Sequence, residues 1–246
     1  MYVQLKPTMR HAKAANGGAV VVKQLRPGSN ELQILQYLSS IKSPCNPTIP
    51  LLDTLKLDTR TFVILREGSS LHIEIEFESF CRKAVEFSFR FLEAVAFLHH
   101  HGIAHLDIKP QNLVIVRGQL FIIDFDLSVH VSGPDALIDR WCGTPKWMAP
   151  EIGNQDGPRC SYSPIRADLW SCGIMLQYLA NNSDAVKEDN HLKALTTRLL
   201  NKNPLLRPLL HLRSSVKLGH SSSEVKGRLK RKPDDLPHDT KRLAIA

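Results

Sequence analysis

The chain has 246 residues, 43% of them hydrophobic, and its 32 Lys and Arg outnumber its 24 Asp and Glu to give a net charge of +8. A chain of this size can bury a sizeable core in one large domain or a two-lobed one. Its longest apolar runs fall well short of the roughly 18 residues of a membrane span, and no charged-then-apolar signal opens it. We therefore expect an intracellular monomer with no membrane partner.

The five cysteines indicate reduced, mostly structural thiols. They show neither paired zinc-binding spacing nor a C-x-x-C motif, which argues against a disulfide framework or a thiol metal site. They are Cys45, Cys81, Cys142, Cys160 and Cys172.

The amino-terminal part of the chain predicts strands around one helix. Residues 19–24 are rich in valine and predict a strand. Residues 30–40 predict a helix whose cap is Ser29 or Asn30. Two further strands of a small lobe are predicted at residues 51–52 and 61–65.

The rest of the chain is mainly helical in pattern. Residues 84–101 repeat apolar residues with a helical period, and Gly102 ends the pattern. Residues 165–180 are apolar nearly all round, which predicts a buried helix. The core face expected for the first of these helices comprises Val85, Phe89, Leu92, Val95, Ala96 and His99, and a last amphipathic series comprises Leu192, Leu195 and Leu199.

A hairpin between these helical regions brings two oxygen-bearing side chains together. Residues 113–116 and 120–123 are apolar runs joined by a short loop that contains Gly118. Asn112 enters this hairpin and Asp124 leaves it, so antiparallel pairing places them about 5 Å apart. Oxygen ligands of this kind suit Mg²⁺.

Asp107 and Lys109 lie just upstream, on a segment broken by Pro110. An extended loop there can place a carboxylate and an ammonium beside the same ion. Phosphoryl transfer needs metal charge on the phosphates, a cation on the migrating group and a carboxylate that orients the attacking hydroxyl. The segment is therefore interpreted as a phosphoryl-transfer site.

With these motifs the chain resembles the eukaryotic protein kinases of serine/threonine type, with a divergent or truncated small lobe. The resemblance covers roughly residues 19–210. It rests on the following motifs: Val20-Val21-Val22-Lys23, the helix segment 30–35, His105-Leu106-Asp107, Asp124-Phe125-Asp126 and Ala149-Pro150-Glu151.

The resemblance implies an α+β fold with a reduced, antiparallel β-rich lobe over about residues 1–67 and a larger helical lobe over about 68–213. It implies ATP and Mg²⁺ as cofactors and a protein substrate, and Lys109 marks serine/threonine specificity. Asp107 and Lys109 are the catalytic candidates, and Asn112 and Asp124 the metal ligands. The implied ATP-binding residues are Lys23, Glu31 as its ion-pair partner, Leu65, Arg66 and Glu67. The implied structural residues are Asp168, which would hold the backbone of the loop that carries Asp107, and Glu151 and Arg207, which would form a buried ion pair.

The sequence also departs from the family. No G-x-G-x-x-G precedes Lys23, which removes backbone N–H groups that would cradle phosphates. Asp126 stands where the family has glycine; if that position needs a positive φ, we expect some strain, and we expect an extra carboxylate near the metal. Leu106 replaces an arginine that pairs with a phosphorylated activation loop. Residues 181–190 are polar where a docking helix would lie.

Two hypotheses of function stay open at this point. The first is ATP- and Mg²⁺-dependent phosphorylation of serine or threonine in proteins. It rests on the presence of Lys23, Glu31, Asp107, Lys109, Asn112 and Asp124. The second is a pseudokinase that acts as a binding module, because the glycine loop is absent. Residues 214–246 predict a disordered basic tail, with a nuclear import signal or a weaker nucleic-acid contact between Lys226 and Lys232, and hence nuclear or cytoplasmic localisation.

Overall fold

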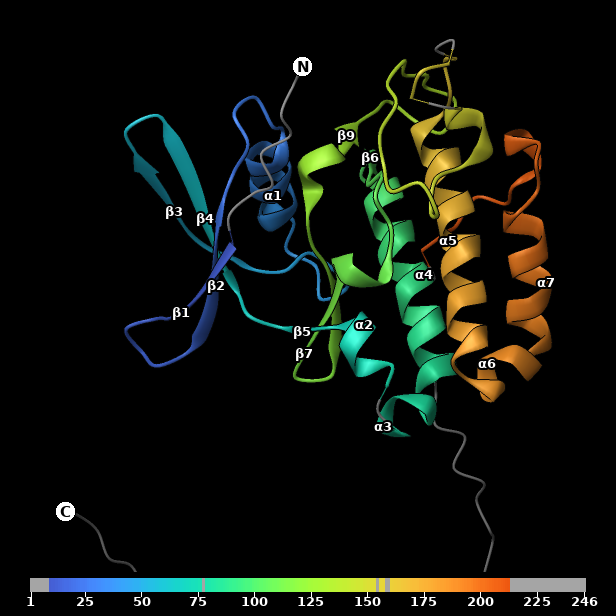
Figure 1. The fold of residues 1–246 in the computed structure, drawn as a ribbon, viewed down its shortest axis with the longest axis horizontal. Helices are drawn as coiled ribbons and strands as arrows, with labels where there is room; N and C mark the ends of the chain where they lie inside the picture. The colour runs from blue at the N-terminus through green and yellow to red at the C-terminus, as the bar shows by residue number, and fades with distance from the viewer. Residues whose placement is uncertain (1–8, 77, 154, 158–159, 213–246) are drawn as a thin grey trace, which may run out of the picture. The chain divides into compact units, whose positions relative to one another are not determined.

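The computed structural model describes residues 9–76, 78–153, 155–157 and 160–212. The chain divides into a first unit, residues 1–213, to which all the described residues belong, and residues 214–246. The predicted basic tail lies outside the described residues. The first unit has the two-lobed α+β architecture expected from the sequence, with antiparallel strands first and helices after them (Figure 1).

The first lobe is built on a four-stranded antiparallel sheet of order β1-β2-β4-β3. Its strands are β1 (Met9–Lys13), β2 (Ala19–Gln24), β3 (Leu51–Leu57) and β4 (Arg60–Arg66). The predicted strand at 19–24 is confirmed. The prediction of a strand at 51–52 is too short, since β3 extends to Leu57. Polar residues such as Asp53 and Lys56 lie exposed on this edge strand, so the sequence has no clear apolar pattern there.

The helix α1 (Glu31–Ser40) begins one residue after the predicted start and packs its buried face, Ile34, Leu35 and Leu38, into the core. Of the two candidate caps, Ser29 is the one that acts, since its hydroxyl accepts a hydrogen bond from the Glu31 N–H at 3.1 Å. This start places the Glu31 side chain, which is also buried, toward the sheet.

The second lobe packs α4, α5 and α7 side by side (Figure 1). Its helices are α2 (Leu71–Glu74), α3 (Glu78–Cys81), α4 (Ala84–His100), α5 (Pro164–Asn181), α6 (Asp184–Glu188) and α7 (Asn190–Leu199). The core face predicted for α4 is partly wrong: Val85 and Phe89 are only half-buried, whereas Phe91 and Leu98 are fully buried. The helix is enclosed on several sides, so one apolar stripe does not describe it.

Residues 181–190, which read as polar, contain the short helix α6. Its one buried residue, Val186, was too weak a signal to predict it. No helix among the described residues has both the length and the apolar character that crossing a membrane requires.

Short strands and 3-10 turns complete the second lobe. The strands β5 (Ser69–Ser70), β7 (Leu113–Val116) and β8 (Gln119–Ile122) form one sheet, and β6 (Ile103–Ala104) pairs with β9 (Val129–His130). Four 3-10 turns complete the described elements: η1 (Pro110–Asn112), η2 (Phe125–Leu127), η3 (Pro150–Ile152) and η4 (Pro204–Leu206).

Arg207 anchors the last turn to the rest of the helical lobe. Its side chain is 2% exposed and donates to Glu151 Oε2 at 2.8 Å and to the Arg166 carbonyl at 2.8 Å. The guanidinium also lies 5.1 Å from the ring centre of Trp170. The ion pair expected between Glu151 and Arg207 is therefore present, and it ties η3 to η4.

We expect Arg207→Ala to lower the free energy of unfolding by about 3–5 kcal/mol, because it leaves the Glu151 carboxylate without its cation in a largely buried site. Urea unfolding measures this change. The control is Arg90→Ala, whose exposed pair with Glu86 should contribute less than about 1 kcal/mol. Equal losses for the two variants would contradict the buried role of Arg207.

Candidate functional site

The hairpin of β7 and β8 brings the two expected metal ligands to the same end of the sheet. Leu113 lies opposite Ile122 in the ladder, and the Ile123 N–H donates to the Asn112 carbonyl at 3.0 Å. Asn112 therefore enters the hairpin beside the point where Asp124 leaves it. This confirms the hairpin geometry predicted from the two apolar runs.

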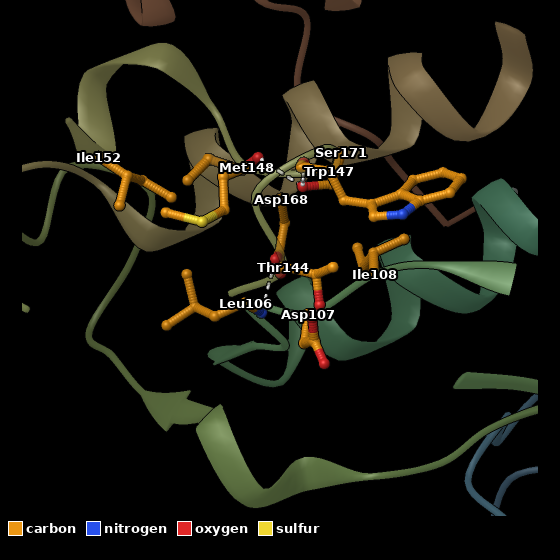
Figure 2. Close-up of a pocket in the computed structure, with 10 residues that line it drawn as sticks. Leu106, Asp107, Ile108, Thr144, Trp147, Met148, Ile152, Asp168 and Ser171 are labelled. Atoms are coloured by element: carbon orange, nitrogen blue, oxygen red, sulfur yellow. Dashed lines mark hydrogen bonds between the residues drawn. The ribbon is translucent and has the colours of Figure 1, made fainter. Parts of the chain in front are cut away.

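Asp107 is buried at the centre of a hydrogen-bonded cluster. Lys109 Nζ lies 2.6 Å from Asp107 Oδ2, and Asn112 Nδ2 donates to the same oxygen at 3.1 Å and to the Asp107 carbonyl at 2.9 Å. The Thr144 hydroxyl lies 2.6 Å from Asp107 Oδ1 and accepts from Lys109 Nζ at 2.9 Å. Figure 2 shows the side chains of Thr144 and Asp107 together.

Thr144 is the member of this cluster that the sequence analysis missed. It lies 37 positions beyond Asp107, in a Gly-Thr-Pro segment with no periodic pattern. Gly143 has φ +116, and a Cβ there would lie 3.0 Å from the Leu106 carbonyl. Only a glycine at position 143 lets the chain come this close to the loop that carries Asp107, and this close approach places Thr144 beside Asp107. Gly143 is therefore the feature of the sequence that could have indicated Thr144.

Asp168 on α5 fixes the backbone of the loop that carries Asp107. Its carboxylate accepts from the N–H groups of His105 at 2.6 Å and Leu106 at 2.8 Å, and lies 3.0 Å from His99 Nε2. Leu106 has φ +65, which is unfavourable for a leucine. These hydrogen bonds hold that conformation, in agreement with the support expected from Asp168.

The Leu106 side chain packs into an apolar cluster rather than facing solvent. The cluster includes Ala104 on β6, residues of the segment that runs from η2 to η3, Tyr162, and the start of α5. Its buried members besides Leu106 are Ala104, Val131, Cys142, Ala149, Ile152, Tyr162, Ile165 and Ala167. Packing around Leu106 therefore holds the segment from η2 to η3 against the loop that carries Asp107.

Lys23 forms a second cluster that joins three elements. Lys23 comes from β2 and is 3% exposed, and its Nζ lies 2.7 and 2.8 Å from the two Glu31 carboxylate oxygens. The same Nζ lies 2.6 Å from Asp124 Oδ1. The ion pair predicted between Lys23 and Glu31 is confirmed, and the contact with Asp124, 101 positions away, adds the end of β8 to it.

Burial and charge compete in setting the pKa values of this cluster. Burial lowers the pKa of Lys23, but the carboxylates of Glu31 and Asp124 outweigh it and raise the pKa above its ordinary value. Burial raises the pKa of Glu31, and Lys23 offsets only part of the rise. Burial also acts to raise the pKa of Asp124, yet Lys23 holds it below its usual range.

The other residues expected to bind ATP, Leu65 to Glu67, lie at and just after the end of β4, which pairs with β2. Leu65 is buried in β4, and Arg66 ends that strand in an exposed position. The Glu67 N–H donates to the Ala19 carbonyl at 3.2 Å, and its carboxylate lies 2.6 Å from His11 Nδ1. Gly68 follows in close contact with β7, since a Cβ there would lie 2.7 Å from Val116 Cγ2.

The expected strain at Asp126 is absent. The residue lies within the 3-10 turn η2, so its backbone does not require a positive φ; the left-handed residue is Asp124, with φ 67° and ψ 68°. Asp126 does add a carboxylate two residues beyond Asp124, and this carboxylate forms an ion pair with Arg26. Sequence reasoning missed Arg26 because nothing in its neighbourhood marks it as a partner of Asp126.

The donor set fits Mg²⁺ bound together with phosphates. Among the described residues no group of three or more His, Cys, Asp or Glu side chains is placed to hold a metal by itself. Mg²⁺, however, is commonly held by one or two carboxylates with the remaining ligands from phosphates and water. The Asp124 carboxylate and the Asn112 amide oxygen are of this type.

The sequence matches the family model described as protein kinase domain over residues 14–225. It is 32% identical over 172 residues to CBL-interacting serine/threonine-protein kinase 5 of Arabidopsis thaliana, covering 67% of this chain and 38% of that protein. It is 32% identical over 164 residues to CBL-interacting protein kinase 24 of Oryza sativa subsp. japonica, covering 64% and 35%. With Nik-related protein kinase of Mus musculus the identity is 36% over 118 residues, 47% of this chain and 8% of that protein. The chain thus spans well under half the length of these relatives.

We expect the stability difference between the protein and Asp124→Asn to depend on pH. The pKa of Asp124 is lowered on folding, so its charge stabilises the fold above the ordinary value of 3.8, and this contribution disappears as the pH falls through the lowered pKa. Urea unfolding between pH 3 and 7 measures it. A difference that stays constant down to pH 3 would contradict the charge interaction with Lys23.

Proposed function

Because this chain belongs to the protein kinase family, we propose that it transfers the γ-phosphoryl group of ATP to serine or threonine hydroxyls of proteins. The observation that carries the proposal is the cluster of Asp107, Lys109, Asn112 and Thr144, in which a buried carboxylate is held in one orientation by three side chains. Such a carboxylate is suited to orient a hydroxyl for attack on a phosphoryl group.

Asp107 would accept the proton of the substrate hydroxyl. In this reaction the substrate oxygen forms a bond to the γ-phosphorus, the bond from that phosphorus to the ADP oxygen breaks, and the hydroxyl proton passes to the carboxylate. Lys109, 2.6 Å from Asp107, would balance negative charge on the migrating group. Its contact with Thr144 keeps Nζ beside the Asp107 carboxylate.

Lys23 would hold the α- and β-phosphates, with Glu31 keeping its ammonium in place. Asn112 and Asp124 would hold Mg²⁺, which supplies positive charge to the phosphates when it is bound. Asp124 contacts Lys23 directly, so nucleotide binding would exchange this carboxylate contact for phosphate contacts. Leu65 to Glu67 would provide the adenine end of the site.

A pseudokinase that binds nucleotide or protein without turnover is the second candidate. Two observations favour it: no G-x-G-x-x-G precedes Lys23, and the Glu67 N–H is already bonded to Ala19. Weaker phosphate binding follows from the missing backbone N–H groups. The paired state of the buried Lys23 and Asp107 supports the first candidate instead, because a binding module has no physical need for this arrangement.

We expect Asp107→Asn to reduce Mg²⁺-dependent transfer of labelled γ-phosphate to a serine- or threonine-containing protein by about 10²–10⁴-fold, because the proton acceptor is lost. The matched control is Arg90→Ala on the exposed face of α4, which should keep the activity of the unaltered protein. Transfer that survives Asp107→Asn would come from a contaminating enzyme.

The shift in melting temperature on adding Mg²⁺ and ATP separates the two candidates further. A shift together with turnover supports the kinase, whereas a shift without turnover in the unaltered protein supports the binding module. Absence of both rejects the nucleotide site.

A further inference from the structure

The ion pair between Arg26 and Asp126 has no part in the function proposed above. We propose that Arg26 is a positioning residue, which neutralises Asp126 and fixes the turn that holds Asp124 toward Lys23. The catalytic part of this inference rests on the proposed phosphoryl transfer, whereas the coupling between the two residues does not.

Arg26 lies on a short, braced loop between β2 and α1. The N–H of the preceding residue, Leu25, donates to the Thr61 carbonyl at 2.9 Å, and the Arg26 carbonyl accepts from Ser29 at 3.1 Å. Asp126 lies in the middle of η2, two residues after Asp124. The pair therefore connects the loop that leads into α1 with the turn that leads away from the metal ligand.

The turn needs this connection because Asp124 adopts a left-handed conformation. An aspartate with φ 67° and ψ 68° is less stable there than in the common regions, so neighbouring contacts must hold it. Phe125 provides one contact, since it is fully buried with its ring centre 5.2 Å from that of His105. Asp126 provides the other, through its ion pair with Arg26.

Charge gives Arg26 its second role. Three carboxylates meet here, Glu31, Asp124 and Asp126, and Lys23 contacts the first two of them. The Asp126 side chain is only 6% exposed, so its charge is poorly screened by water. Its proximity also contributes to the raised pKa of Glu31, after burial and against the effect of Lys23.

Arg26 supplies one of the two positive charges that balance the three carboxylates. Its side chain is 34% exposed, so the pair lies at the edge of the core and not in open solvent. With Arg26 the local charge is three negative against two positive, and without it three against one. An excess of negative charge beside Asp124 would repel the phosphates that the site must receive.

The test compares Arg26→Ala, Asp126→Gly and the double variant, because glycine is the residue that the family has at position 126. Arg26→Ala leaves a buried carboxylate unpaired, and we expect it to lower the folding equilibrium constant about tenfold below that of Asp126→Gly. The double variant should return to within about threefold of Asp126→Gly. Arg26→Lys keeps the charge and should recover part of the loss.

Val186→Ala is the control for general loss of stability, since Val186 is buried on α6 and is not among the residues that make up the site. Well below the melting temperature, we expect Arg26→Ala to raise the Mg²⁺ concentration for half-maximal phosphate transfer about tenfold and to lower kcat, while Val186→Ala changes neither. Hydrogen exchange of residues 123–128 should accelerate in Arg26→Ala and return toward normal in the double variant.

Losses that add in the double variant would overturn the inference, as would equal Mg²⁺ dependence of Arg26→Ala and Val186→Ala. If the unaltered protein transfers no phosphate, the proposed function fails. The positioning role is then decided by the unfolding cycle, hydrogen exchange and the Mg²⁺ dependence of the ADP-induced melting shift, and additive losses or an unchanged Mg²⁺ dependence still overturn it.

Discussion

The buried ammonium of Lys23 is the interaction on which the arrangement of the site depends. A cation with 3% exposure is stable only if carboxylates surround it, and the two that do so come from α1 and from the end of β8. The need to pair one charge therefore brings together the sheet, the helix beside it and the hairpin of the other lobe. The remaining site residues are positioned from these three elements.

The cluster around Asp107 is organised differently, because its acid is oriented by hydrogen bonds from neutral and cationic groups on loops. Asp107 depends on Lys109 and Thr144, and the loop beneath it depends on Asp168. The two clusters meet where Asn112 and Ile123 share a backbone hydrogen bond. Ion pairs of Lys23 with two carboxylates fix one side of the site, and hydrogen-bond donors around Asp107 fix the other.

Local patterns allowed much of this to be predicted. The hairpin follows from its two apolar runs, and a lysine in a buried strand needs a carboxylate partner. The choice of Glu31 as that partner and the support from Asp168 were implied by the resemblance to the protein kinases. The length of β3 could not be predicted, because an edge strand tolerates polar residues such as Asp53 on its exposed positions. Thr144 and Arg26 were missed because their partners, Asp107 and Asp126, lie 37 and 100 positions away in the sequence. The chemistry of a single residue does not indicate which distant residue it will contact.

Because of Leu106, the position of the segment between η2 and η3 depends on the volume of the side chains packed around it. The leucine lies in an apolar cluster with Cys142 and Ala149, where an arginine would have offered a charge to an added phosphate. Close packing responds to the size and shape of side chains and hardly at all to ionic strength. This contact therefore behaves like part of a hydrophobic core. Evolutionary change here would substitute apolar side chains of different size, and would not add residues for covalent modification.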